Sequence, residues 1–227
     1  MYITYPKPVQ ELYMIVVVGG IKGGSGKTTI ATNLAVLRAH AGKKLLLVDA
    51  DEQRSSSIFA NQRDVQDISP KWSTVQLAGQ SLHSQVNRLK PDYDDIIIDV
   101  GGRDTTSQRS ALVVADIFLV PFKPRSYDVW TLADVKTTIR EMKLVNPKLK
   151  AYAFINQADP KGTDNEDAFN ILKECEELQC INLTIGNRKT FGNSSSDGLG
   201  VTEVKSPDKK AVNEIQELYK YVYNIGT

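Results

Sequence analysis

The stretch that decides the fold runs from Met14 to Thr29 and reads MIVVVGGIKGGSGKTT. Its first five residues form an apolar, largely β-branched run, which is typical of a buried parallel strand. A helix is predicted from Lys27 to about Ala41, where Gly42 ends it. The glycines between strand and helix let the backbone turn tightly and point several N–H groups inward. Because the helix N-terminus adds partial positive charge, the segment is predicted to bind phosphate groups.

The residue types inside this loop suit ATP and Mg²⁺. Lys27 is expected to reach the β and γ phosphates, the Thr28 hydroxyl to ligate Mg²⁺, and Thr29 to contact the α phosphate. The rest of the cradle is predicted to be Gly23, Gly24, Ser25 and Gly26. The general phosphate-loop pattern requires glycine five residues before Gly26, and Ile21 stands there instead.

The segment from Lys22 to Thr29 resembles the deviant Walker A loop of the ParA/MinD family of ATPases. In that family an additional lysine opens the loop, and Lys22 occupies its place. The resemblance implies that Lys22 crosses the interface of an ATP-sandwiched homodimer and acts catalytically on the nucleotide of the partner subunit. A second cation can stabilise charge on the phosphoryl oxygens, as an arginine finger does. The alternative interpretation is that Lys22 is an ordinary solvated lysine of the loop.

An acidic segment, Asp49-Ala50-Asp51-Glu52-Gln53, follows the apolar run 45–48. It resembles the Asp-x-Asp-Pro-Gln box of the same family, with Glu52 in place of the usual proline. By that resemblance Asp51 orients the attacking water and Asp49 supports the Mg²⁺ shell. The simpler alternative is that an aspartate at a strand end caps the following helix.

Two further segments complete the expected site. Ile96-Ile97-Ile98-Asp99 has the Walker B pattern, in which a carboxylate at a strand end holds Mg²⁺ through water. Asp99-Val100-Gly101-Gly102 resembles a switch that senses the γ phosphate. Asn156 follows another apolar run, and the resemblance implies that its amide reads the adenine edge. The alternative is an asparagine in the turn before Asp159-Pro160.

The remaining pattern alternates short apolar runs with amphipathic stretches. Strands are predicted at 14–18, 45–48, 96–98, 117–120, 152–155 and 181–185. The clearest helical pattern spans 126–144. This order predicts an α/β, three-layer P-loop NTPase fold, with a mainly parallel sheet flanked by helices on both faces. One domain is expected over residues 1–227, with 1–12 as a loose N-terminal arm. Ligands bind such sheets beyond the carboxyl ends of the strands.

Bulk properties exclude several classes of protein. The formal net charge is +1, so any nucleic-acid binding requires a local basic patch. Two cysteines cannot build a disulfide framework, and no apolar run approaches the roughly 20 residues that span a bilayer. The N-terminus lacks the pattern of a secretory signal. The expected location is cytoplasmic and nucleoid-associated.

The resemblance favours a plasmid or chromosome partition ATPase. It implies an ATP-dependent homodimer, binding to nonspecific DNA, and a centromere-binding partner protein that stimulates hydrolysis. Three groups of basic residues could form the surface that DNA binding requires. They are Lys136, Arg140 and Lys143 with Lys148 and Lys150; Arg188 with Lys189; and Lys205, Lys209 and Lys210.

Three other functional classes compete with partition. An orphan ATPase that positions an organelle, secretion or conjugation complex would use the same chemistry. A MinD-like membrane ATPase needs a C-terminal amphipathic helix with a basic face. The stretch with Ile215, Leu218 and Val222 is instead expected to pack in the core, so no membrane binding is predicted. An iron-protein-like reductase would need bridging cysteines, and Cys175 and Cys180 lie far from the nucleotide motifs in sequence.

Overall fold

The structure is a computed structural model that describes residues 14–102, 105–124, 131–161 and 163–224. Its described strands form one sheet in the order β3-β2-β4-β1-β5-β6-β7, and each neighbouring pair is parallel. The strand bounds are β1 Met14–Val18, β2 Leu45–Ala50, β3 Ser73–Gln76, β4 Asp95–Val100, β5 Ile117–Phe122, β6 Lys150–Ala158 and β7 Gln179–Gly186.

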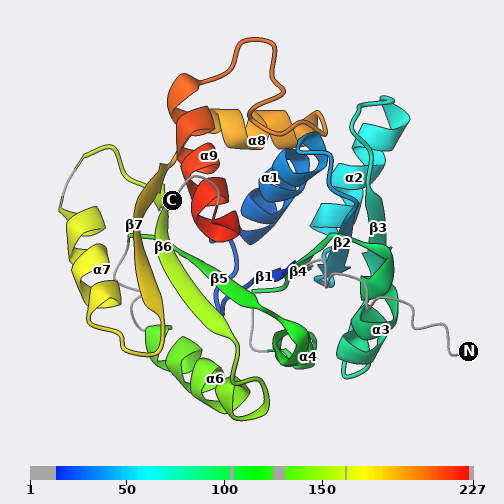
Figure 1. Cartoon of the computed structure of the whole chain (residues 1–227). Helices are drawn as coiled ribbons and strands as arrows, with labels where there is room; N and C mark the ends of the chain where they lie inside the picture. Colours follow the sequence, from blue (N-terminus) through cyan, green and yellow to red (C-terminus); the bar gives the residue numbers. More distant parts are fainter. Residues whose placement is uncertain (1–13, 103–104, 125–130, 162, 225–227) are drawn as a thin grey trace, which may run out of the picture.

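Helices cover both faces of the sheet, as the predicted three-layer fold requires (Figure 1). One face carries α1 Lys27–His40, α8 Lys189–Ser196 and α9 Lys209–Tyr223, with α2 Ser55–Val65 packed beside α1. The other face carries α3 Leu82–Leu89, α4 Thr106–Val114, α6 Leu132–Val145 and α7 Asp164–Lys173. A short 3₁₀ turn, Lys90–Asp92, follows α3.

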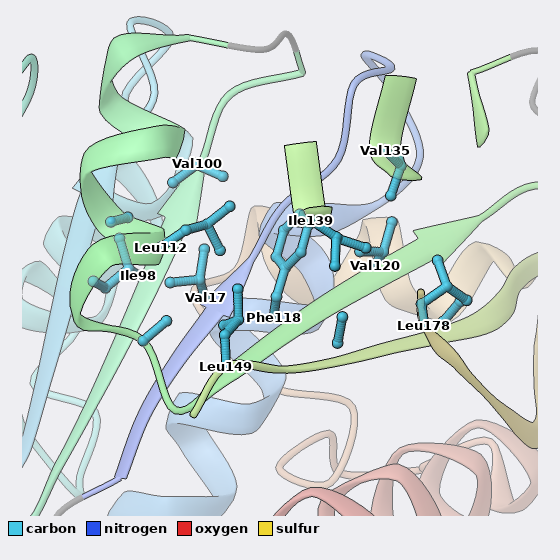
Figure 2. Packing of buried hydrophobic residues seen from close by; sticks show 14 of the residues in the cluster. Val17, Ile98, Val100, Leu112, Phe118, Val120, Val135, Ile139, Leu149 and Leu178 are labelled. Atoms are coloured by element: carbon cyan, nitrogen blue, oxygen red, sulfur yellow. The ribbon is translucent and has the colours of Figure 1, made fainter. Parts of the chain in front are cut away.

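Each face of the sheet has its own apolar core, because successive strand residues point to opposite faces. Val17, Ile98 and Phe118 pack toward α4 and α6, and Figure 2 shows Phe118 lying among Ile139 and its neighbours. Residues one position along each strand pack toward α1 and α9 instead. The central strands are buried on both faces, which is why their sequences read as continuous apolar runs.

Most predicted elements are present, with three differences. The edge strand β3 was not predicted, since Val75 is its only large apolar residue. Within the described residues, the helix expected from 126 begins at Leu132, and 126–130 lie outside that part of the chain. The acidic residues Asp49 and Asp99 lie inside β2 and β4 rather than just after them.

The C-terminal helix confirms its expected role. Ile215, Leu218 and Val222 of α9 are all buried against the sheet. The predicted arm at 1–12 lies outside the described residues. Of the helices that the structure describes, none combines the length and apolar character needed to cross a membrane.

Candidate functional site

A cleft of about 1250 Å³ lies at the carboxyl ends of the central strands. It is bounded by the loop before α1, by the segments that follow β2, β3 and β4, and by the start of α4. The polar side chains that line it include Lys27, Thr28, Thr29, Asp49, Asp51 and Gln157. Strand order produces this gathering, because β1, β2 and β4 are adjacent in the sheet although they are far apart in the sequence. The cleft therefore unites the predicted phosphate loop with the first acidic segment.

The loop itself adopts the conformation that its glycines allow. Gly24 and Gly26 have φ values of 73° and 85°, in the left-handed region that favours glycine. The Lys27 ammonium donates a hydrogen bond of 2.8 Å to the Lys22 carbonyl across the loop. Burial lowers the pKa of Lys27, while the charges of Asp99 and Asp51 oppose that shift. A partly desolvated ammonium at the N-terminus of a helix is suited to a phosphate.

Two side chains of β6 donate hydrogen bonds to backbone carbonyls of the loop. Asn156 donates from its amide to the Ser25 carbonyl at 2.7 Å, and Gln157 donates to the Gly24 carbonyl at 3.2 Å. Asn156 is 3% exposed, whereas Gln157 lines the cleft with a φ of 55°. The donor of Asn156 is thus engaged with the loop, and its contact with adenine stays a prediction. Gln157 was not singled out in the sequence.

Asp49 makes the helix-capping interaction that its simpler interpretation predicts. Its Oδ2 accepts a 2.7 Å hydrogen bond from the Ser57 backbone N–H at the start of α2, as a helix-capping carboxylate does. Its Oδ1 accepts from the Asp51 backbone N–H at 3.2 Å. Asp49 also borders the cleft, so capping does not remove it from the site. Its role toward Mg²⁺ stays a prediction.

Asp51 faces the cleft from the turn after β2. Its Oδ1 accepts a 3.1 Å hydrogen bond from the Gln53 backbone N–H. Gly101 lies opposite, where an added Cβ would stand 3.3 Å from the same oxygen. The first acidic segment and the predicted switch are therefore in contact across the cleft, as expected if both respond to the γ phosphate.

Asp99 is fully buried beneath the cleft, next to Thr28 and Lys27. Burial raises its pKa to about 7, and Asp49 adds to the shift, while the hydroxyls of Ser56 and Thr28 and the charge of Lys27 oppose it. Ser56 donates to Asp99 Oδ2 at 2.5 Å. Asp99 Oδ1 has no hydrogen-bond partner among the described residues. A buried carboxylate oxygen without a partner is costly unless a ligand or water completes it.

These oxygen donors fit Mg²⁺ bound together with a nucleotide. In the described part of the chain, no three His, Cys, Asp or Glu side chains gather to hold a metal ion by themselves. Mg²⁺ normally takes only one or two protein ligands, with phosphate oxygens and waters completing its shell. Thr28 and Asp99 could supply those ligands here, and Asp49 lies on the neighbouring strand at the same level.

The predicted switch rests directly on the loop. A Cβ on Gly102 would lie 2.6 Å from the backbone of Gly23, so only glycine fits without movement. Farther along, Gln108 of α4 is fully buried and accepts a 3.0 Å hydrogen bond from the Gly20 backbone N–H. The region after β4 thus contacts the N-terminal side of the loop at Gly20 and Gly23. Residues 103 and 104 lie outside the described part.

Comparison with known proteins agrees with this geometry. A family model described as the CobQ/CobB/MinD/ParA nucleotide binding domain matches residues 16–201. The chain is 26% identical over 215 residues to maintenance of carboxysome distribution protein A of Halothiobacillus neapolitanus, covering 90% of this chain and 94% of that one. It is 28% identical over 163 residues to the sporulation initiation inhibitor protein Soj of Bacillus subtilis, covering 56% and 64%.

Solved structures share the fold at low identity. The ATP complex of an McdA variant from Cyanothece has a TM-score of 0.76 at 17% identity and covers 95% of this chain and 98% of that one. A putative plasmid partition protein from Borrelia burgdorferi, bound to AMPPNP, has a TM-score of 0.73 at 18% identity, covering 94% and 98%. MinD from Aquifex aeolicus has a TM-score of 0.72 at 19% identity, with the same coverage. The chain belongs to the CobQ/CobB/MinD/ParA family of nucleotide-binding domains.

Proposed function

We propose that this chain is a Mg²⁺-dependent ATPase that dimerises on ATP, binds nonspecific DNA and uses hydrolysis to drive plasmid or chromosome partition. The single observation that carries the proposal is the cleft in which the phosphate loop, Asp51 and the switch meet above the buried Asp99. Family membership supports nucleotide binding. The proposals of an ATP-dependent dimer, of DNA binding and of a centromere-binding partner rest on the resemblance to partition ATPases.

The chain's own residues divide the proposed chemistry among them. Lys27 and the loop N–H groups bind the phosphates and neutralise charge that develops on the γ phosphoryl group. Asp51, which lines the cleft, orients the attacking water. Thr28 and Asp99 would hold Mg²⁺, which supplies Lewis-acid polarisation of the phosphoryl oxygens when bound. Lys22 is assigned to the nucleotide of the partner subunit.

A second candidate is an orphan positioning ATPase with the same chemistry and a different cargo. The specific observation in its favour is the similarity to the carboxysome distribution protein, which covers 90% of this chain. A gene for a small DNA-binding protein directly downstream would favour partition over this candidate. The MinD-like alternative has less support, because the apolar positions of α9 are buried in the core.

The candidate DNA surfaces differ in their ion pairs. Glu177 contacts the three candidate basic residues of α6. Its carboxylate forms ion pairs with Lys136, at 3.4 Å, and with Arg140, and its backbone carbonyl accepts a 3.1 Å hydrogen bond from Lys143. Arg188 pairs with Glu214 and Asp208. By contrast, four exposed lysines near the starts of α8 and α9 make no ion pair within the described residues, and they are Lys189, Lys205, Lys209 and Lys210. We place the DNA contact on these four lysines.

The deciding experiment measures binding to a nonspecific DNA duplex with ATP, in Mg²⁺ and in EDTA, across a salt series. Binding is expected only with ATP and Mg²⁺. Replacing the four lysines with glutamine should weaken it and reduce the salt slope by about 0.9 for each phosphate that is no longer neutralised. Replacing Lys136, Arg140 and Lys143 serves as the matched control, with a much smaller effect. No ATP-dependent DNA binding by the wild type would overturn the partition proposal.

Hydrolysis is tested separately with Asp51→Ala. This variant is expected to bind ATP as the wild type does, since the Asp51 carboxylate bonds the backbone of its own turn rather than the phosphate loop, and to lose turnover by about 100-fold or more. Calorimetry measures binding and phosphate release measures turnover. Normal turnover in the variant would remove Asp51 from the role of water-orienting residue.

A further inference from the structure

The first turn of α2 holds both acidic residues of the predicted Mg²⁺ site. Ser56 donates its hydroxyl to Asp99 Oδ2, and Ser57 donates its backbone N–H to Asp49 Oδ2. Ser56 is fully buried, so its hydroxyl has no access to solvent. Neither interaction was evident in the sequence, where the two serines look like ordinary residues of a helix start. One short turn therefore determines how the two carboxylates lie.

We propose that Ser56 is a positioning residue for the metal site: its hydroxyl holds one oxygen of Asp99 and thereby points the other, Oδ1, toward Thr28 and the phosphates. This inference rests on the proposed Mg²⁺-ATP function and deepens it. The geometry behind it is that Oδ2 is bound at 2.5 Å while Oδ1 lacks a partner among the described residues. A carboxylate anchored through one oxygen has little freedom to rotate. Groups behind a metal ligand commonly fix its orientation in this way.

The position of Ser56 also links the metal site to a larger element. α2 begins beside the cleft, and its opposite side carries Ile58 and Val65, which are 65% and 73% exposed. Through its hydroxyl, Ser56 connects this helix directly to the Asp99 carboxylate. The same turn reaches Asp49 through a backbone N–H, which no side-chain substitution removes.

The chain supplies its own control for the Ser56–Asp99 hydrogen bond. Ser57 follows Ser56 on the same turn, and its hydroxyl has no hydrogen-bond partner among the described residues. Ser57→Ala removes a hydroxyl of the same kind while the backbone bond to Asp49 stays. Ser56→Ala removes the hydroxyl that binds Asp99. A difference between the two variants therefore reports the bond to Asp99 rather than the removal of a serine from α2.

The experiment compares ATP affinity by calorimetry in Mg²⁺ and in EDTA for the full chain. For the wild type, Mg²⁺ is expected to strengthen ATP binding. Ser56→Ala should keep the EDTA affinity within about twofold, because the loop is intact, and should weaken Mg²⁺ affinity by about 10- to 100-fold, the usual cost of removing such a partner. Ser57→Ala should match the wild type in both conditions. Titration of Mn²⁺ with paramagnetic resonance, in the presence of ADP, gives the metal affinity without turnover.

Two further variants keep the test decisive if Ser56→Ala folds poorly. Ser56→Thr and Ser56→Val have nearly the same shape and differ in the hydroxyl. The threonine variant should keep the Mg²⁺ effect and the valine variant should lose it. Equal Mg²⁺ affinity in both, or wild-type Mg²⁺ affinity in Ser56→Ala, overturns the role of Ser56 alone. A wild type that binds ATP equally with and without Mg²⁺ overturns the proposed function and this inference with it.

Discussion

Gly102 shows how a single missing Cβ allows two functional segments to meet. An added methyl group would press on the backbone of Gly23, which cannot yield as a side-chain end could. Gly102→Ala is therefore expected to destabilise the protein by about 1–3 kcal/mol, the usual cost of overpacking, and to weaken ATP binding. Urea unfolding and calorimetry measure the two effects.

A matched glycine substitution tests whether that effect is local. Gly192 lies in α8, and a Cβ added there would meet no atom within 4 Å. Gly192→Ala should be neutral or should stabilise the protein by up to about 1 kcal/mol, since alanine is the better helix former. A similar decrease in stability in both variants would contradict the close packing of Gly102 on the loop.

We expect nucleotide binding to depend strongly on Lys27. Its side chain lies within the loop, and the residue is only 6% exposed. Lys27→Ala should lower ATP affinity by at least about 100-fold, because the variant has no ammonium to make a charge-assisted bond to the phosphates in a desolvated site. Calorimetry provides the measurement, with far-ultraviolet circular dichroism to confirm folding. Wild-type affinity in the variant would show that the loop binds phosphate through its backbone alone.

The candidate site residues predicted from the sequence belong to contiguous motifs, and the candidates that act across the fold were missed. Lys27, Thr28, Asp49, Asp51 and Asp99 follow apolar runs or lie in the loop, where local pattern predicts their place. The missed side chains bind partners that are 43, 88 and 133 residues away along the chain. They are Ser56, Gln108 and Gln157. Only the pairing of strands and helices brings such partners together.

At the scale of elements, Glu177 connects α6 with the segment after α7. Burial of its carboxyl opposes ionisation, but its own backbone N–H, the Cys175 thiol and Arg140 together lower its pKa to about 2. A carboxyl with a lowered pKa stabilises the fold above its unfolded pKa, near 4.5, and this contribution is lost as the pH falls through 2. Its neighbours Lys136 and Arg140 are partly exposed, which limits the energy involved.

Glu177→Gln is accordingly expected to destabilise the protein at pH 7 by about 1 kcal/mol or less. The difference from the wild type should shrink between pH 4.5 and pH 2, where the wild-type carboxyl becomes neutral as well. Denaturant unfolding at several pH values measures the free energy of unfolding of both proteins and so gives this difference. Glu176→Gln changes the same charge at an exposed neighbour and should have no such effect. A difference that is independent of pH would contradict the ion-pair explanation.

Elements were predicted best where apolar residues dominate. The buried strands β1, β2, β4 and β5 were all located, because both of their faces are covered and their sequences are continuously apolar. The edge strand β3 was missed, since a strand at the rim needs fewer apolar residues. Short helices such as α8 carry too few apolar positions to show a helical period.

At the scale of the whole molecule, the proposed role of Lys22 is to join two copies of the chain through ATP. Lys22→Ala is expected to retain ATP binding by the monomer and to lose ATP-dependent dimerisation, because the side chain can no longer reach the nucleotide of the partner subunit. Light scattering with and without ATP measures the molar mass. Lys27→Ala is the control that should lose both properties. If the Lys22→Ala variant still doubles its molar mass when ATP is added, Lys22 has no role in dimerisation and is an ordinary solvated loop residue.

The register of the sheet has a consequence for the evolution of this protein. Asp49 and Asp99 are direct partners on neighbouring strands β2 and β4, so two acidic groups are fixed side by side in a buried layer. Burying two acidic groups in that arrangement opposes folding, and apolar residues there would give a more stable sheet. Under selection for thermal stability alone, Asp49 and Asp99 should therefore be among the first residues to be replaced. Their persistence in a lineage would be a record of selection for activity acting against selection for stability.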